Sequence, residues 1–311
     1  TLGFEGTMGD WIIDPKISYS FAEEDDSDNA DVTFRNDMKD TVGTIEWSNP
    51  QRPTITPSDT SIYSPAELGF KELEITENVS KDSEFAFSVN AERETDLGTL
   101  KVGFKSKNRE KDVDDYIIVY EADMTMADFD PQTLDWQFAG QTFSQQANPD
   151  MIYALRNQLD SLSVDFSNDY ARDFVTEEKV NALYIQNTYT WDKGVIVAGV
   201  RYEDASTDSQ AFDQDGNQVF AGSNHSFFAP SINVKYFLDD RLQLRGAIWK
   251  GLSRPGFKKT APKLDYDNDE GDISGSAGNP DLKPYEAINY DLSLEFYGDD
   301  MTFASVGLFR K

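Results

Sequence analysis

Oxygen-bearing side chains alternate along one acidic segment, which reads Asp265-Tyr266-Asp267-Asn268-Asp269-Glu270-Gly271-Asp272. Calcium prefers carboxylate and amide oxygens, so Asp265, Asp267 and Asp269 are candidate ligands of a structural calcium ion. The segment departs from the EF-hand pattern, because its glycine comes one residue late and no twelfth-position glutamate follows. A solvated acidic loop is the alternative, and we expect no other cofactor.

Residues suited to catalysis are few or unspecific. The chain has no cysteine, which excludes disulfides, thiolate metal sites and a cysteine nucleophile, and its one histidine is His225. Carboxylate pairs that imitate a glycosidase acid and nucleophile arise by chance among 57 Asp and Glu in 311 residues. His225 stands in a Gly-Ser-Asn-His-Ser stretch and is expected to be an exposed polar residue. The sequence therefore predicts no enzyme.

The balance of charge limits the partners of the chain. Only 28 basic residues oppose the 57 acidic ones, which gives a formal net charge of −29. A surface this acidic repels phosphate backbones, so nucleic-acid binding is not expected. Aromatic residues make up 13% of the chain, too many for a disordered acidic tail, so a folded protein is expected. A transmembrane helix needs roughly eighteen consecutive apolar residues, which no segment has.

Apolar residues recur at every second position through much of the chain, which predicts β-strands with one apolar and one polar side. Between Trp11 and Phe21, for example, Ile13 and Ile17 lie on the apolar side and Asp14 on the other. Such strands are expected at about 11–21, 85–91, 100–104, 178–191, 195–204, 226–238, 241–252, 285–297 and from 301 onward. With a short strand before Trp11, the count is about ten.

The connections between these strands alternate between short turns and long segments. The long ones run over 23–81, 108–177, 205–225 and 253–284. The first holds fourteen acidic and five basic residues and the second fifteen and four, so these two loops carry −20 of the net charge of −29. Outer-membrane barrels have this pattern, because tight periplasmic turns alternate with long extracellular loops and only half of each strand meets lipid. We therefore predict an all-β fold, an antiparallel transmembrane β-barrel with long extracellular loops. Its outward band is expected to contain Ile13, Ile17, Phe87, Leu244 and Leu292.

Two sequence motifs follow one another in the last quarter of the chain. The first is Leu252-Ser253-Arg254-Pro255-Gly256-Phe257, and the second is Gly278-Asn279-Pro280-Asp281-Leu282-Lys283-Pro284, which precedes Asn289-Tyr290-Asp291-Leu292. Together they resemble the C-terminal barrel region of TonB-dependent outer-membrane receptors, in which an S-R-P element ends one strand and a G-N-P-x-L-K-P element leads into the next. The likeness is to the large proteobacterial group associated with oligosaccharide uptake.

The two motifs are expected to be structural. Residues before prolines are pushed toward extended conformations, and prolines cannot donate ladder hydrogen bonds, so they belong at the start of a strand. We therefore assign strand entry to Asn279, Pro280 and Pro284 of the second motif. A structural role, rather than ligand contact, is expected for these three residues and for Arg254 and Pro255.

The resemblance implies a larger protein than this chain. The family has an N-terminal plug with a TonB box and a barrel of roughly 22 strands, whereas this sequence shows neither plug nor box and about ten strands. We expect residues 1–311 to be one part of a receptor barrel, with the plug domain and the barrel C-terminus outside the sequence. The resemblance also implies a place in the bacterial outer membrane, surrounded by its lipid. It further implies uptake of a nutrient that the TonB-ExbB-ExbD system drives through the plug.

Two ligand classes compete within this family. Oligosaccharides are held by aromatic faces and by carboxylate or amide hydrogen bonds, and the long loops offer Trp47, Trp136, Tyr153 and Tyr170. A ferric siderophore or other metal complex is the alternative, although anionic complexes would be repelled by so acidic an entrance. Oligosaccharide is therefore the preferred expectation. A secreted all-β glycan-binding module remains the alternative outside the membrane.

Overall fold

The computed structural model of residues 1–311 describes the chain except for 28, 37–41, 52, 134–136, 139–140, 143–144, 160–161, 169–171, 214–215 and 270–271. The chain forms two compact units, which are described separately. Unit 1 comprises Thr1–Glu24, Val79–Asp114 and Tyr170–Lys311, and unit 2 comprises Asp25–Asn78 and Asp115–Asp169. None of the helices that the structure describes is long and apolar enough to cross a membrane.

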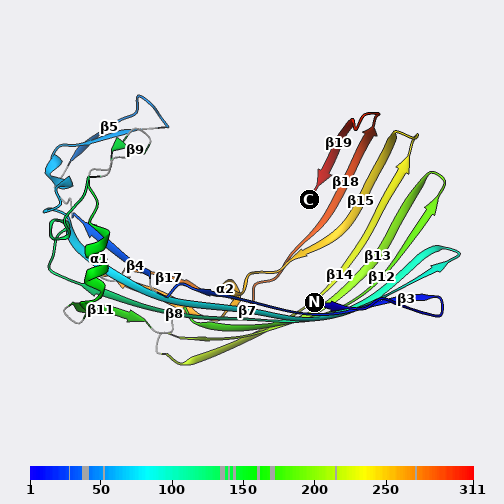
Figure 1. The fold of residues 1–311 in the computed structure, drawn as a ribbon, viewed down its shortest axis with the longest axis horizontal. Coiled ribbons are helices and arrows are strands. Elements are labelled where there is room, and N and C mark those ends of the chain that lie inside the picture. The colour runs from blue at the N-terminus through cyan, green and yellow to red at the C-terminus, as the bar shows by residue number, and fades with distance from the viewer. Residues whose placement is uncertain are drawn as a thin grey trace. The chain divides into compact units, whose positions relative to one another are not determined.

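The main sheet is antiparallel, and its strands lie side by side in chain order (Figure 1). Its path is β1 (Leu2–Gly3), β3 (Trp11–Asp25), β7 (Gly69–Thr95), β8 (Gly98–Glu121), β12 (Phe174–Trp191), β13 (Gly194–Phe212), β14 (Gln218–Phe237), β15 (Leu242–Ser253), β18 (Tyr285–Tyr297) and β19 (Phe303–Arg310). Three further strands pair beside this path, β2 (Gly6–Met8) with β3, β4 (Asn29–Arg35) with β7 and β11 (Ser163–Asn168) with β8. The antiparallel all-β prediction is therefore confirmed. In the described chain β1 and β19 do not pair with each other, so the sheet is a partial barrel that is not closed.

Cross-strand register gives the sheet of unit 1 an apolar face. Phe104, Leu183, Tyr202 and Phe228 lie directly opposite one another across β8, β12, β13 and β14. Directly opposite residues share a face. Leu183 is 57% exposed and Phe228 is 61% exposed, so no other described part of the chain covers these two side chains. We call this side the apolar face. Of the five residues expected in the outward band, Ile17, Phe87, Leu244 and Leu292 are exposed as well, and Ile13 is half-buried.

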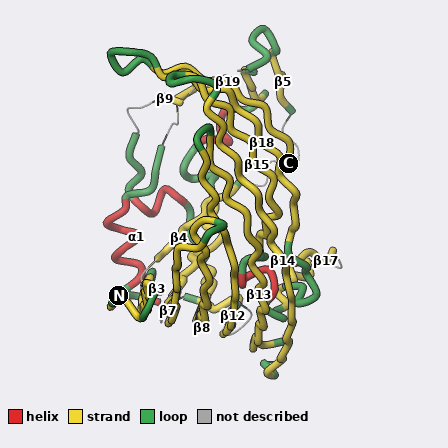
Figure 2. The backbone as a smooth tube through the Cα atoms, turned by 90° about the vertical axis from the view of Figure 1, so that its right-hand side faces the viewer, coloured by secondary structure: helices red, strands yellow, loops and turns green. Residues whose placement is uncertain are grey.

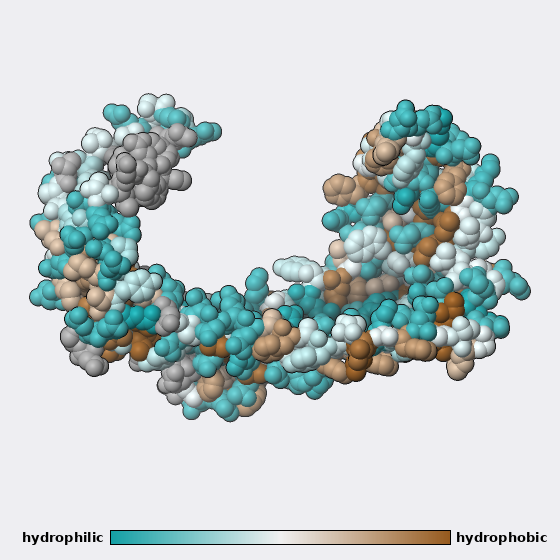
Figure 3. All heavy atoms as spheres, in the orientation of Figure 1, coloured by the Kyte–Doolittle hydropathy of each residue, from teal (hydrophilic) through white to brown (hydrophobic). Residues whose placement is uncertain are grey.

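The opposite side of the sheet, which we call the polar face, carries charges that pair across strands. Lys101 Nζ lies 3.2 Å from Glu92 Oε2, and Lys107 Nζ lies 3.5 Å from Glu84 Oε2. The alternation of apolar and polar residues in the sequence thus becomes two chemically different faces. On the side of the molecule that Figure 3 draws, hydrophobic residues are interspersed among hydrophilic ones.

The predicted long connection over 205–225 is wrong. β13 continues to Phe212 and β14 begins at Gln218, so only residues 213–217 join them. These strand ends could not be predicted from hydropathy, because residues 203–210 read Glu-Asp-Ala-Ser-Thr-Asp-Ser-Gln and are polar on both faces. The connections over 23–81 and 108–177 are also shorter than expected, since β7 begins at Gly69 and β8 reaches Glu121.

Unit 2 consists mainly of residues that the sequence assigned to two long loops, and it has a hydrophobic core of its own. Its helical elements are η1 (Thr60–Tyr63), η2 (Met126–Phe129) and α1 (Pro149–Arg156), and two small hairpins join β5 (Gly43–Glu46) to β6 (Thr54–Pro57) and β9 (Gln137–Phe138) to β10 (Gln141–Thr142). Leu73 is fully buried, and the rings of Phe34 and Phe129 contact at 5.2 Å in an edge geometry. These segments therefore form a folded body rather than loose loops.

The connection between β15 and β18 also has structure. It contains α2 (Phe257–Thr260) and a hairpin of β16 (Leu264–Asp269) and β17 (Asp272–Ala277). Figure 2 distinguishes these strands and the helices by colour. The acidic segment at 265–272, expected as a calcium loop or a solvated loop, is thus mostly strand backbone.

Candidate functional site

A pocket of about 550 Å³ lies on the polar face of unit 1, near the ends of β12, β13 and β14 that are remote from the short turns. Both sequence motifs contribute to its wall. Its lining consists of Glu178, Ala205, Thr207, Gly222, Ser223, Asn224, His225, Arg254, Pro255, Phe257, Thr260, Pro280, Asp281, Leu282, Lys283 and Pro284. We call it the motif pocket.

The floor of the motif pocket is set by strand register. Glu178 of β12 lies opposite Thr207 of β13, and Thr207 in turn lies opposite Ser223 of β14. One step along the same face, Ala205 lies opposite His225. Because these residues share the polar face, their side chains converge on one side of the sheet.

The roof of the motif pocket is the chain that follows β15. Phe257 and Ala261 pack against Phe174 and Ala211, which lie on β12 and β13. The guanidinium of Arg109 also lies over the Phe257 ring, 5.0 Å from its centroid. Apolar burial and a cation–π contact therefore anchor α2 to the wall.

Backbone hydrogen bonds hold the second motif against the segment that follows the first motif. The Asn279 N–H donates to the Lys259 carbonyl oxygen at 2.7 Å, and the Gly278 N–H donates to the Lys263 carbonyl oxygen at 3.0 Å. A Cβ at position 278 would lie 1.7 Å from the Ala261 carbonyl oxygen, so only glycine fits. The Asn279 side chain accepts a hydrogen bond from the Asp281 N–H at 3.0 Å and holds the turn.

A network of ion pairs lies under the pocket. Arg254 donates to Glu203 Oε2 at 2.6 Å, and its Nε lies 3.8 Å from Oε1 of Glu178. Glu178 is only 6% exposed and also lies 3.2 Å from Lys107 Nζ. Arg201 also belongs to this network, because its Nε donates a 2.7 Å hydrogen bond to Glu203 Oε1. A buried carboxylate is costly unless cations compensate it, and Lys107 and Arg254 lie close enough to Glu178 to do so.

Two nitrogen atoms of the pocket lining lack a hydrogen-bond partner. Arg254 Nε and His225 Nε2 are both buried, and neither makes a hydrogen bond within the described part of the chain. His225 Nε2 lies 3.5 Å from Glu286 Oε1. Lys283 is exposed at the pocket, and no ion pair joins it to any carboxylate that the structure describes. The motif pocket therefore offers cationic and polar groups to a ligand with hydrogen-bond acceptors.

The family is decided by a match along nearly the whole chain. The model described as TonB dependent receptor-like, beta-barrel matches residues 13–311. The chain belongs to this family. It is thus part of an outer-membrane β-barrel with extracellular loops, and TonB-dependent receptors are transporters rather than enzymes, which agrees with the expectation that no catalysis occurs here.

Individual relatives of this TonB-dependent receptor barrel are distant. A protein named Probable TonB-dependent siderophore receptor PirA, from Acinetobacter baumannii, is 27% identical over 150 residues, which cover 43% of this chain and 17% of that protein. The siderophore receptor PiuA of Acinetobacter baumannii has a structure with TM-score 0.50 and 12% identity, covering 97% of this chain and 38% of that one. The ferric yersiniabactin uptake receptor FyuA of Yersinia pestis gives TM-score 0.45 and 14% identity, with coverage of 98% and 34%. The chain spans about a sixth of the first protein and less than two fifths of each structure, and the likeness to PiuA shows the fold alone.

The receptor structure brings together most of the motif residues that the sequence singled out. Arg254, Pro255, Pro280 and Pro284 all line the motif pocket, and Asn279 shapes its edge. His225, expected to be an exposed polar residue, lies within β14 and is half-buried in the pocket wall. The register of β12 to β14 and the ion pairs of Glu178 could not be seen in the sequence, although each motif could.

The aromatic ligand candidates of the receptor do not form one cluster. Trp47 and Tyr153 both belong to unit 2 and are 63% and 66% exposed, and the described side chains include no aromatic pair between them. Trp136 and Tyr170 lie outside the described residues.

The calcium hypothesis stays a prediction. Asp265, Asp267 and Asp269 lie on β16, but their side chains are outside the described part of the receptor. Among the side chains that are described, no group of three or more His, Cys, Asp or Glu could hold a metal ion.

Proposed function

We propose that this chain forms part of the wall of an outer-membrane receptor that takes up a ferric siderophore. The observation that carries the proposal is the 27% identity to a protein whose name describes a probable TonB-dependent siderophore receptor. The proposal reverses the preference for oligosaccharide that the acidic composition suggested. It also includes the TonB-ExbB-ExbD system as the partner that drives uptake through a plug domain.

The motif pocket supports an anionic ligand. Ferric siderophores frequently carry negative charge, and the long-range field of an acidic protein opposes their approach. Donors inside the pocket act at contact distance, where a charge-assisted hydrogen bond is about twice as strong as a neutral one and can offset this long-range repulsion. Arg254 and Lys283 place such donors at one pocket, and His225 adds a third group there.

The test is a binding and uptake assay with the receptor that carries this chain. Tryptophan quenching would measure the Kd of a panel of ferric siderophores, and radioactive iron would measure uptake by cells. Lys283→Gln should weaken binding of the cognate complex about threefold to tenfold, as expected for the loss of a partly solvated charge contact. Lys258→Gln removes the same charge from exposed α2 without touching the pocket and should leave the Kd unchanged.

A receptor that binds no ferric complex from a broad panel, or that loses equal affinity with either lysine variant, would contradict this proposal. Arg254→Gln is less suitable as a test, because it also leaves Glu178 and Glu203 short of a partner.

Oligosaccharide uptake is the second candidate, and a specific observation favours it. Trp47 and Tyr153 present exposed rings on unit 2, where aromatic faces could stack on sugar rings. Glycan-array binding that is lost in Trp47→Ala and retained in Lys283→Gln would select this ligand class over the siderophore.

A further inference from the structure

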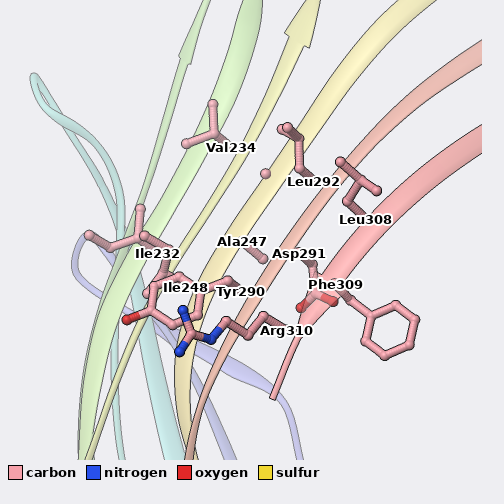
Figure 4. Close-up of a pocket in the computed structure, with 11 residues that line it drawn as sticks. Ile232, Val234, Ala247, Ile248, Tyr290, Asp291, Leu292, Leu308, Phe309 and Arg310 are labelled. Atoms are coloured by element: carbon pink, nitrogen blue, oxygen red, sulfur yellow. The ribbon is translucent and has the colours of Figure 1, made fainter.

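The strand β14 has an edge that β15 covers only in part. The two strands pair as far as Ser231, which lies opposite Trp249, and Figure 4 shows Ile232 within the paired region. From Pro230 back to Gln218, β14 still pairs with β13 on one side. On the other side this stretch has no partner strand in the described part of the chain. We call this side of residues 218–230 the open edge.

Two features of the chain end the pairing of β14 with β15. In an antiparallel sheet, the backbone groups of successive residues point alternately to the two neighbouring strands. The Phe237 N–H donates to the Lys193 carbonyl oxygen beside β13, so the even-numbered residues of β14 point toward β15. Pro230 is the first of these without an N–H, and it stands where the pairing stops. The chain after β15 also turns away, because Phe257 packs against Phe174.

The open edge leaves backbone donors and acceptors without partners. By the same alternation, the N–H and carbonyl groups of Gly222 and Asn224 point away from β13. Neither residue makes a backbone hydrogen bond on that side with any part of the chain that the structure describes.

The height of the open edge keeps these groups out of hydrocarbon. Gly222 lies fifteen residues from Phe237, the last residue of β14 before the short turn. A strand rise of about 3.4 Å and a tilt of about 40° place it roughly 40 Å from the short turns, beyond an apolar band about 25 Å tall. A polar ligand can therefore reach the open edge from water.

The motif pocket extends to the open edge. Its lining includes four consecutive residues of β14, 222–225, and five consecutive residues of the second motif, 280–284. Side chains alternate between the two faces of a strand, so a pocket above one face alone would be lined by every second residue. The consecutive residues show that the pocket reaches past the polar face to the edge of the strand. We call the space between 222–225 and 280–284 the edge slot.

The edge slot suits another backbone in an extended conformation. Gly222, Ser223 and Asn224 are exposed and small or polar, and a glycine within a strand allows another backbone to approach closely. Four residues of an extended chain would span roughly 13 Å along the slot. Backbone amides of such a chain would supply the acceptors and donors that Gly222 and Asn224 lack.

The charged groups beside the edge slot suit a carboxylate. Lys283 is exposed at the slot, and Arg254 Nε and His225 Nε2 lack hydrogen-bond partners among the described residues. Side chains of a strand added at the open edge would alternate between the two faces, so every second one would point toward these groups. Lysine and arginine make their strongest hydrogen bonds with ionised acceptors such as carboxylates.

We propose that the edge slot pairs with the extended peptide backbone of the ligand, and that Lys283 holds a carboxylate of the same ligand. A strand added to a sheet edge gains affinity from main-chain hydrogen bonds and specificity from pockets for alternate side chains. This inference rests on the proposed function, because it takes the ferric complex to be the occupant. It narrows the ligand to a ferric siderophore built on a peptide.

The test uses the complete receptor in mild detergent, with tryptophan quenching to measure Kd. Ferric complexes of linear peptide siderophores should bind at least about tenfold more tightly than ferric complexes of equal charge without a peptide backbone, as expected for two or more main-chain hydrogen bonds. N-methylation of the ligand amides, one at a time, should weaken binding about fivefold at alternate positions only. The reason is that every second amide of an added strand faces the edge.

A pair of proline variants tests the receptor side. Asn224→Pro removes one N–H that points into the edge slot and should weaken binding of the peptide complexes about fivefold. Ser226→Pro removes the next N–H of the open edge, outside the pocket lining, and is the matched control that should keep the wild-type Kd. The N-methyl series on the wild-type receptor decides the matter even if Asn224→Pro does not fold.

The outcomes separate this inference from the proposed function. Failure of every ferric complex to bind would refute the proposed function itself. Ferric complexes that bind without preference for a peptide backbone, or an N-methyl series without alternation, would overturn the strand addition and leave siderophore uptake standing. Equal losses in Asn224→Pro and Ser226→Pro would likewise overturn the assignment of the edge slot.

Discussion

Replacing Val102 by arginine tests whether the apolar face meets hydrocarbon. Val102 lies opposite Ile185 on the apolar face, four residues into β8. The strand rise and tilt place it roughly 10 Å from the short turns, near the middle of an apolar band about 25 Å tall. Arginine at that depth destabilises a barrel by about 2–4 kcal/mol, so we expect a loss of about 3 kcal/mol in the free energy of unfolding. That corresponds to a shift of about a hundredfold in the folding equilibrium.

Val197→Arg is the matched control for this variant. Val197 lies three residues into β13 on the polar face, between Thr188 and Asn233, where a charge remains solvated. Urea titration of the complete receptor in phospholipid vesicles, followed by tryptophan fluorescence, would compare the two. The control should lose less than about 1 kcal/mol. Equal losses, or a larger loss for Val197→Arg, would refute the assignment of the two faces.

Three further predictions concern the connections between strands. Gly278→Ala should destabilise the roof of the motif pocket by about 1–3 kcal/mol and expose it to protease, whereas Gly256→Ala, whose Cβ would have no neighbour within 4 Å, should not. Phe129→Ala should cost about 3–5 kcal/mol, and hydrogen exchange should increase in unit 2 while β13 and β14 stay protected; uniform exchange would argue against a separate core. Calorimetry tests the predicted calcium site, where Asp267→Asn should remove any heat of binding at millimolar calcium, and persistence of that heat would assign it elsewhere.

The alternation of side chains was enough to predict the sheet. A period of two over about ten residues marks a strand with different faces, and the nine ranges found in this way, with the short strand before Trp11, correspond to the ten strands of the main path. The alternation ends where the strands leave the apolar band. At residues 203–210 both faces are polar, so a period of two carries no hydropathy contrast, and the sequence predicts a loop where the structure has a strand.

The candidate site was only half predictable. The prolines and Asn279 predicted a strand entry, because proline restricts the backbone dihedral angles of the residue before it, which is a local property of the sequence. That the same residues roof a pocket depends on α2 folding back against Phe174 and on the register that brings Glu178 under Arg254. Both are contacts between positions far apart in the chain, which no local pattern encodes. The folded core of unit 2 was missed for the same reason, since Phe34 and Phe129 meet across nearly a hundred residues.

The chain-ordered sheet has a consequence for biogenesis. Because each strand of the main path pairs with the next one along the path, every hairpin can join its predecessor without a crossover and without threading. Assembly can then advance as a front that moves along the polypeptide, and the nascent wall has one growing edge whose unpaired backbone groups are costly in hydrocarbon. An insertion machine that shields one strand edge at a time would be sufficient for such a wall. A mutation that blocks one hairpin should therefore arrest the front at that hairpin and leave the earlier strands paired.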